Sequence, residues 1–175
     1  MFDTKLFLNR MTLITGDVNA GKTRFTRDIL DAFLEEGERD IAVIDLAPEM
    51  YKGIGGKMAD VAEQGVLYMT TGIDPPRLLG RNQREVQSVA KKNAAAIDRL
   101  FTSYLGTPKK VLFINDVTLY LHRGTMERLC RVLSSAETRI INAYYGESLG
   151  DSALSRKERR LVEELMTACD LLISL

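Results

Sequence analysis

The sequence predicts a three-layer α/β domain, in which a mainly parallel, doubly wound sheet of about five core strands carries helices on both faces. Two observations lead to this prediction. Short apolar, β-branched runs alternate with segments of helical periodicity along all 175 residues. The composition, with 45% hydrophobic and 27% charged residues, is typical of one globular domain with its own core.

The first strand–helix–strand unit lies between residues 11 and 45. Residues 11–15 form a buried strand that ends at Gly16, residues 22–36 place their apolar side chains on one helical face, and residues 41–44 form a strand that ends at Asp45. A connection of this length predicts a right-handed crossover between parallel strands. Residues 5–8 are expected to form a short strand before this unit.

The same alternation continues to the end of the chain. Further strands are expected at 65–70, 111–114, 139–141 and 171–173, and helices at about 82–104, around 126–133 and around 161–166. Pro75 and Pro76 are expected to prevent helix formation until about Asn82. With no internal repeat or long linker, we predict one nucleotide-binding domain over residues 1–175. The segment at about 48–84 is expected to be a lid or switch-like insertion, because it is long for a simple crossover.

Composition excludes several classes of protein. Lys plus Arg and Asp plus Glu both total 24, and this balance disfavours nucleic acid as a partner and binding to a membrane surface. No apolar stretch approaches the roughly 18 residues that span a bilayer, and the N-terminus does not resemble a secretory signal. A single histidine and two distant cysteines, Cys130 and Cys169, provide no structural zinc site. Reduced cysteines and a cytoplasmic location are expected.

The strongest motif follows the first strand. Residues 16–23, GDVNAGKT, fit the pattern GxxxxGK[ST] at every specified position. The glycines allow successive backbone N–H groups to converge on phosphate oxygens, and the following helix directs its positive end to the same place. Lys22 would place its charge between the β- and γ-phosphates, and the Thr23 hydroxyl would coordinate Mg²⁺. The alternative is a glycine turn with an incidental lysine.

This motif and its strand–helix context resemble the P-loop NTPase superfamily. The resemblance implies the P-loop NTPase fold and the binding of ATP, or of another nucleoside triphosphate, with Mg²⁺. In ATPases of the MinD/ParA type an extra signature lysine stands where this chain has Asp17, so their dimer-dependent mechanism is not expected here. The residues expected to bind the nucleotide are Gly16, Asp17, Val18, Asn19, Ala20, Gly21, Lys22, Thr23 and Arg24.

A P-loop enzyme also needs a carboxylate near Mg²⁺, expected at the end of a strand beside the loop strand. Asp45 and Asp116 are the two candidates for catalysis and metal binding. The strand that ends at Asp45 resembles the second-strand motif of MinD-like ATPases and RNA 5′-hydroxyl polynucleotide kinases, although only the first acid of the Asp-x-Asp-x-Gly-Gln pattern of those kinases is kept. The alternative for both acids is turn chemistry at a strand end.

Asp116 stands one position later than a standard Walker B acid, where the chain has Asn115. Because side chains alternate along a strand, we expect one of these two residues to face the nucleotide and the other to cap the next segment.

Basic segments supply further candidates. Arg77 and Arg81 are candidate catalytic arginines that would stabilise the transferring phosphoryl group, against the alternative of a solvated helix start. The glycine-rich run 53–57 is expected to be a mobile switch segment. The charged run 156–160 is expected to be an exposed helix face, and His122 is expected at the surface without a role.

The segment after the fourth expected strand bears on base specificity. Guanine-specific P-loop proteins carry Asn-Lys-x-Asp here, whereas this chain has Asn142 followed by Ala143, Tyr144 and Tyr145. The absence of the aspartate disfavours a GTPase of the Ras type. A tyrosine here could stack on adenine or lie half-buried at the rim.

Three functions are compatible with these residues. The first is a Mg²⁺-dependent NTPase or a small-molecule or nucleotide kinase that transfers the γ-phosphoryl group. The second is a nucleotide-dependent switch that acts on a protein partner through residues 48–84. The third is a polynucleotide kinase-like RNA-processing module, which the neutral charge disfavours. A homo-oligomer is compatible with each.

Overall fold

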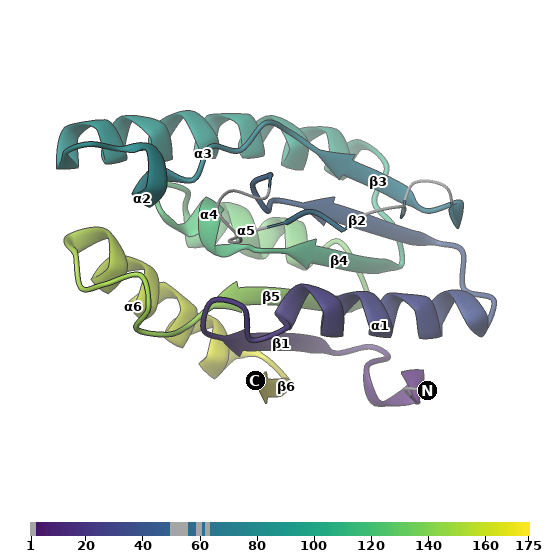
Figure 1. The fold of residues 1–175 in the computed structure, drawn as a ribbon. Coiled ribbons are helices and arrows are strands. Elements are labelled where there is room, and N and C mark those ends of the chain that lie inside the picture. The colour runs from purple at the N-terminus through teal and green to yellow at the C-terminus, as the bar shows by residue number, and fades with distance from the viewer. Residues whose placement is uncertain (1–2, 50–55, 59–60, 62–63) are drawn as a thin grey trace.

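The computed structural model describes residues 3–49, 56–58, 61 and 64–175, and these contain a six-stranded sheet in which every pair of neighbouring strands is parallel (Figure 1). Across the sheet the order is β3-β2-β4-β5-β1-β6. The strands are β1 (Met11–Gly16), β2 (Ile41–Asp45), β3 (Leu67–Thr70), β4 (Val111–Asn115), β5 (Thr138–Tyr144) and β6 (Leu171–Ser174).

Helices cover both faces of this sheet (Figure 1). The helical elements are the 3₁₀ turn η1 (Thr4–Leu6), α1 (Lys22–Glu35), α2 (Pro76–Leu79), α3 (Gln83–Gly106), α4 (Thr118–Leu121), α5 (Met126–Leu133) and α6 (Ala153–Ala168). Helix α1 packs on one face, where Phe33 meets Phe113 of β4 edge-on at 6.0 Å between ring centroids. Helices α3, α4, α5 and α6 pack on the other face. The prediction of a doubly wound parallel sheet is therefore confirmed.

Every residue of the central strands β1, β2 and β4 is buried, and successive side chains alternate between the two core clusters. Leu13 belongs to the cluster under α3, α5 and α6, whereas Ile14 belongs to the cluster under α1. This alternation is the two-residue period of a strand that is covered on both faces. It explains why these strands read as continuous apolar runs.

The strand order corrects one expectation about the site. We expected the acidic residue to end a strand beside β1, but β5 lies between β1 and β4, and both lie between β1 and β2. The register instead places Asp45 opposite Asn115 on the neighbouring strand, and Ile114 opposite Ile141. The ends of β2, β4 and β5 therefore lie level with one another, and Asn142 of β5 connects the loop after β1 to the end of β4.

Two local expectations were wrong. Residues 5–8 were expected to form a strand, but Thr4–Leu6 form a 3₁₀ turn, whose first residues are capped by the Asp3 carboxylate. Helix was not expected before Asn82, but α2 begins at Pro76. Proline is tolerated in the first turn of a helix because its missing N–H would have no partner there.

Much of the expected insertion at 48–84 includes residues 50–55, 59–60 and 62–63, so Gly53 and Gly55 lie outside the described residues. Within the part of the chain that is described, no helix combines the length and the hydropathy needed to cross a bilayer.

Candidate nucleotide-binding site

The loop after β1 is curled by left-handed backbone. Asn19 has φ 59° and Gly21 has φ 90°, and the Ala20 N–H donates to the Asp17 carbonyl at 3.3 Å. Glycine is suited to such a φ because it has no Cβ to clash with the backbone. Within the described chain, several backbone N–H groups of this curl have no hydrogen-bond partner, namely those of Asn19, Gly21, Lys22 and Thr23. They form a concave set of donors at the positive end of α1, which is suited to an anion.

The Lys22 ammonium lies over this curl. Its Nζ donates to the Asp17 carbonyl at 2.6 Å and lies 5.8 Å from the ring centroid of Tyr144. Burial lowers the pKa of Lys22, because a buried site disfavours the charged form, while the charges of Asp116 and Asp17 oppose this effect. A partly desolvated cation beside unpaired amides attracts an anionic ligand strongly.

Thr23 is the first residue of a buried chain of polar groups. Its hydroxyl donates to Asn115 Oδ1 at 3.2 Å, and Asn142 Nδ2 donates to the same oxygen at 2.8 Å. Asn142 Nδ2 also donates to Thr26 Oγ1. Because the Thr23 proton points to Asn115, the lone pairs of its oxygen are free for a cation.

Asp116 follows the last residue of β4 in a left-handed conformation with φ 57°. Its N–H donates to Asn142 Oδ1 at 2.8 Å, and its buried Oδ1 has no partner among the described residues. Burial raises the pKa of Asp116 to about 7, against the opposing effects of a hydrogen bond from Thr118 and of the charge of Lys22. A buried carboxyl with one unpartnered oxygen and a pKa near neutrality is a common property of functional acids.

The positions of Asn115 and Asp116 differ from the sequence-based expectation. One of the two was expected to cap the next segment, but α4 has Val117 at its N-cap and no side-chain cap. Asn115 contacts Thr23 below the loop, and Asp116 lines the cavity in front of it. The left-handed turn at Asp116 makes this arrangement possible, because the strand ends between the two residues.

Asp45 is held entirely by its neighbours. Its Oδ1 accepts from the Ala47 N–H and from Asn115 Nδ2, and its Oδ2 accepts from the Met58 N–H at 2.6 Å and from the Tyr68 hydroxyl at 2.9 Å. The side chain is fully buried and does not line the cavity. These contacts indicate that Asp45 fixes the end of β2, in place of the expected catalytic and metal-binding role.

Asp17 joins the loop to the segment after β5. Its carboxylate accepts from the Val18 N–H at 2.6 Å, from the Glu147 N–H at 3.2 Å and from the Ser148 N–H at 3.3 Å. These bonds, led by the one from Val18, lower the pKa of Asp17 to about 2. A Cβ on Gly146 would lie 2.6 Å from Asp17 Oδ1, so this contact requires glycine. Asp17 therefore positions the loop through its carboxylate.

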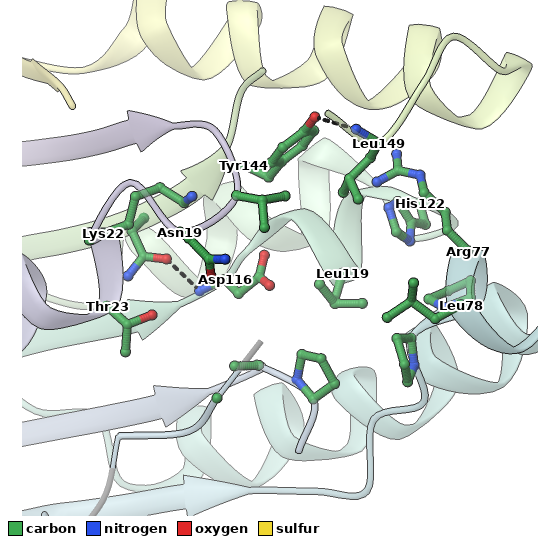
Figure 2. Close-up of a pocket in the computed structure, with 18 of the residues that line it drawn as sticks. Asn19, Lys22, Thr23, Arg77, Leu78, Asp116, Leu119, His122, Tyr144 and Leu149 are labelled. Carbon is green, nitrogen blue, oxygen red and sulfur yellow. Dashed lines mark hydrogen bonds between the residues drawn. The ribbon is translucent and has the colours of Figure 1, made fainter. Parts of the chain in front are cut away.

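A cavity of about 340 Å³ lies in front of the loop (Figure 2). Six of the nine residues predicted to bind nucleotide line it: Val18, Asn19, Gly21, Lys22, Thr23 and Arg24. Figure 2 shows Arg77 and His122 on the side of the cavity away from Lys22 and Thr23. Arg81 is exposed and does not line the cavity, so the structure brings only one of the two predicted arginines to this site.

Arg77 belongs to a buried cluster that sequence reasoning missed. Glu158 Oε2 accepts from Arg77 Nη2 at 2.7 Å and contacts His122 Nε2. His122 and Glu158 are each only 2% exposed, so the expectations of a surface histidine and of an exposed helix face at 158 were wrong. A signal was present: Glu158 shares a helical face with the buried Leu154 and Val162, at a spacing of four residues.

Other groups near the cavity have structural partners. The Tyr144 hydroxyl accepts from the Leu149 N–H at 3.1 Å, and its ring lines the cavity. Among the described residues, no group of three or more histidine, cysteine, aspartate or glutamate side chains is placed to hold a metal ion. Any cation here would therefore need ligands from the nucleotide and from hydroxyl groups.

Comparisons with known proteins bear on the fold. No protein-family model matches the chain, and no curated protein matches it in sequence. A solved structure similar to it is that of the flagellar accessory protein FlaH from Methanocaldococcus jannaschii, with a TM-score of 0.50 and 10% sequence identity. The match covers 95% of this chain and 71% of the FlaH chain. The chain has the fold of the P-loop ATPases. At this identity the likeness establishes the fold alone.

Proposed function

We propose that the protein binds a nucleoside triphosphate, with ATP as the favoured one, together with Mg²⁺, and transfers the γ-phosphoryl group to water or to a small acceptor. One observation supports this best: the unpaired amides of residues 19–23, the Thr23 hydroxyl and the unpartnered oxygen of Asp116 all lie at one end of one cavity. A phosphate chain with its cation satisfies all three.

The phosphates would take the place that the loop prepares. The free N–H groups of Asn19, Gly21, Lys22 and Thr23 would donate to phosphate oxygens, and Lys22 Nζ would exchange the Asp17 carbonyl for a phosphate oxygen. Asp17 keeps the loop curled before the ligand arrives, because its carboxylate holds three amides on both sides of the gap. Such preorganisation reduces the cost of ordering the loop on binding.

The residues present fit Mg²⁺. Thr23 offers hydroxyl lone pairs because its proton is directed to Asn115, and Asp116 offers a carboxylate oxygen, directly or through water. When bound, Mg²⁺ would neutralise charge on the phosphate oxygens. The pKa of about 7 means that Asp116 can also hold or release a proton near neutrality. Asp45 is assigned no contact with the metal, because both of its oxygens are occupied.

The shape of the cavity favours a small acceptor over a large one. The cavity extends from the loop to Arg77 and Leu78 of α2, and its volume of about 340 Å³ is in the range of small-molecule sites. Arg77 is the arginine placed to act on the transferring group, while Arg81 is exposed. A cytoplasmic location stays a prediction.

The proposal is tested by titration calorimetry with Mg²⁺ and ATP, followed by an assay for released or transferred phosphate. Lys22→Ala is expected to lower ATP affinity by about a hundredfold, because a charge-assisted contact to phosphate is lost, while Lys5→Ala, on an exposed residue of η1, leaves it unchanged. Equal affinities of Lys22→Ala and the wild-type protein would contradict the site. Wild-type turnover in Asp116→Asn would remove Asp116 from the reaction.

A further inference from the structure

The end of the cavity away from the loop has a character of its own. We call it the α2 subsite and define it by Arg77, Leu78, Leu119, His122 and Leu149, all of which line the cavity. In Figure 2 these side chains lie apart from Lys22 and Thr23, on the far side of the opening. Three of the five are leucines, so the walls of the subsite are largely apolar.

Two buried polar atoms of the subsite have no partner in the described chain. They are His122 Nδ1 and Arg77 Nε. Glu158 binds the opposite side of both residues through His122 Nε2 and Arg77 Nη2. Buried polar atoms usually have a partner, and leaving one without a hydrogen bond costs about 1–3 kcal/mol. A pair of such atoms on the wall of a cavity therefore indicates a ligand that supplies the missing bonds.

The chemistry of the two atoms differs. The Glu158 carboxylate can only accept hydrogen bonds, so His122 Nε2 carries the proton that it receives and Nδ1 is left as an acceptor in the neutral ring. Burial lowers the pKa of His122, which keeps the ring neutral at physiological pH. Arg77 Nε is a donor. The subsite thus offers one acceptor and one donor, and a hydroxyl group, which donates and accepts, satisfies both.

Charge in the subsite is balanced. The positive charge of Arg77 is paired with that of Glu158 at 2.7 Å, and His122 is neutral. A carboxylate or phosphate ligand would bring a negative charge into a largely apolar, already neutral pocket, at a cost in desolvation. A neutral ligand avoids that cost.

We infer that the α2 subsite binds a hydroxyl group of a second, neutral small molecule, which lies beside the nucleotide in the same cavity. This inference rests on the proposed function, because the nucleotide is assigned the other end. It narrows the acceptor to the class of small alcohols and polyols, and it gives Arg77, His122 and Glu158 a common task in recognising the acceptor.

The sequence supplies a convenient probe, because His122 is the only histidine. Protein labelled with ¹³C and ¹⁵N in histidine gives ring signals from this one residue. We would titrate glycerol, sodium acetate and inorganic phosphate at neutral pH, both into free protein and into protein with Mg²⁺ and a non-hydrolysable ATP analogue. Calorimetry on the same samples reports the binding of the analogue. Glycerol is expected to shift the His122 signals saturably at roughly millimolar concentration, as suits a fragment-sized ligand.

A matched pair of variants tests where glycerol binds. Leu78→Phe enlarges a side chain that lines the subsite and is expected to weaken the glycerol response about tenfold or more. Leu79→Phe makes the same change on the next residue, which is 44% exposed and lies outside the lining, and is expected to leave the response unchanged.

The outcomes separate this inference from the proposed function. If the analogue binds but glycerol never shifts the His122 signals, or if acetate or phosphate shifts them at lower concentration, the inference is wrong. It is also wrong if the analogue alone shifts the signals and prevents the glycerol response, because the subsite then holds the nucleotide. A saturable glycerol response in free protein that does not bind the analogue would support the subsite and refute the proposed function.

Discussion

Replacing Asp116 by asparagine should stabilise the protein at alkaline pH while impairing turnover. Asp116 is buried, its Oδ1 has no partner in the described chain, and its pKa is about 7 instead of the 3.8 of an ordinary aspartate. Each pKa unit corresponds to about 1.4 kcal/mol, so the ionised side chain costs the fold up to about 4 kcal/mol. Asparagine keeps the shape of the side chain and removes the charge.

The sign of the pH dependence follows from proton counting. Between the unfolded pKa of 3.8 and the folded pKa of about 7, the folded protein binds more protons than the unfolded chain. The free energy of unfolding of the wild-type protein therefore falls as pH rises through this window and levels off above it. From about pH 5 to pH 8, the wild type should lose about 3 kcal/mol more than Asp116→Asn does.

Urea denaturation without metal or nucleotide, at several pH values, measures this difference directly. For a chain of this size, about 3 kcal/mol also corresponds to roughly 6–12 °C in the melting temperature. Asp28→Asn, on an exposed residue of α1, is the control and should follow the wild-type pH profile. Parallel profiles of Asp116→Asn and the wild type would refute the assignment of a raised pKa to a buried, unpaired Asp116.

Other contacts around the cavity give further predictions. Gly146→Ala forces its Cβ against the Asp17 carboxylate and should lower both ATP affinity in calorimetry and the free energy of unfolding, by about 1–3 kcal/mol; no change in either would contradict the contact. Asp17→Asn keeps the shape but weakens the three bonds from amides, and should lower ATP affinity several-fold without unfolding the protein. Glu158→Ala leaves Arg77 without its partner and should cost about 3 kcal/mol in urea denaturation, clearly more than Glu158→Gln; equal losses would argue against the ion pair.

The sequence predicted the fold well because the strands are covered on both faces. Residues 11–15, 41–44 and 111–114 read as apolar runs, and each lies inside an observed strand. The glycine-rich loop was equally clear, because its function depends on backbone geometry that only certain residue types permit. Strand order was beyond reach, since the insertion of β5 between β1 and β4 depends on packing across the whole sheet.

The polar side chains were harder to assign than the backbone. Asp45 and Asp116 look alike in sequence, each following an apolar run, yet one accepts four hydrogen bonds and the other keeps an oxygen without a partner in the described chain. That difference is set by Met58, Tyr68 and Asn115, which no local pattern places beside Asp45. The buried pair of His122 and Glu158 was missed for the same reason: the two residues lie 36 positions apart.

The central claim is that the curl of residues 17–23 holds a polyphosphate through backbone N–H groups. ¹H–¹⁵N NMR of the uniformly labelled protein, titrated with Mg²⁺ and ATP, tests it most directly. The amide signals of Asn19, Gly21, Lys22 and Thr23 should move downfield together as phosphate oxygens become their acceptors, and Lys22→Ala should abolish the change at the same ATP concentration. Saturable ATP binding that leaves these four signals in place would contradict the claim.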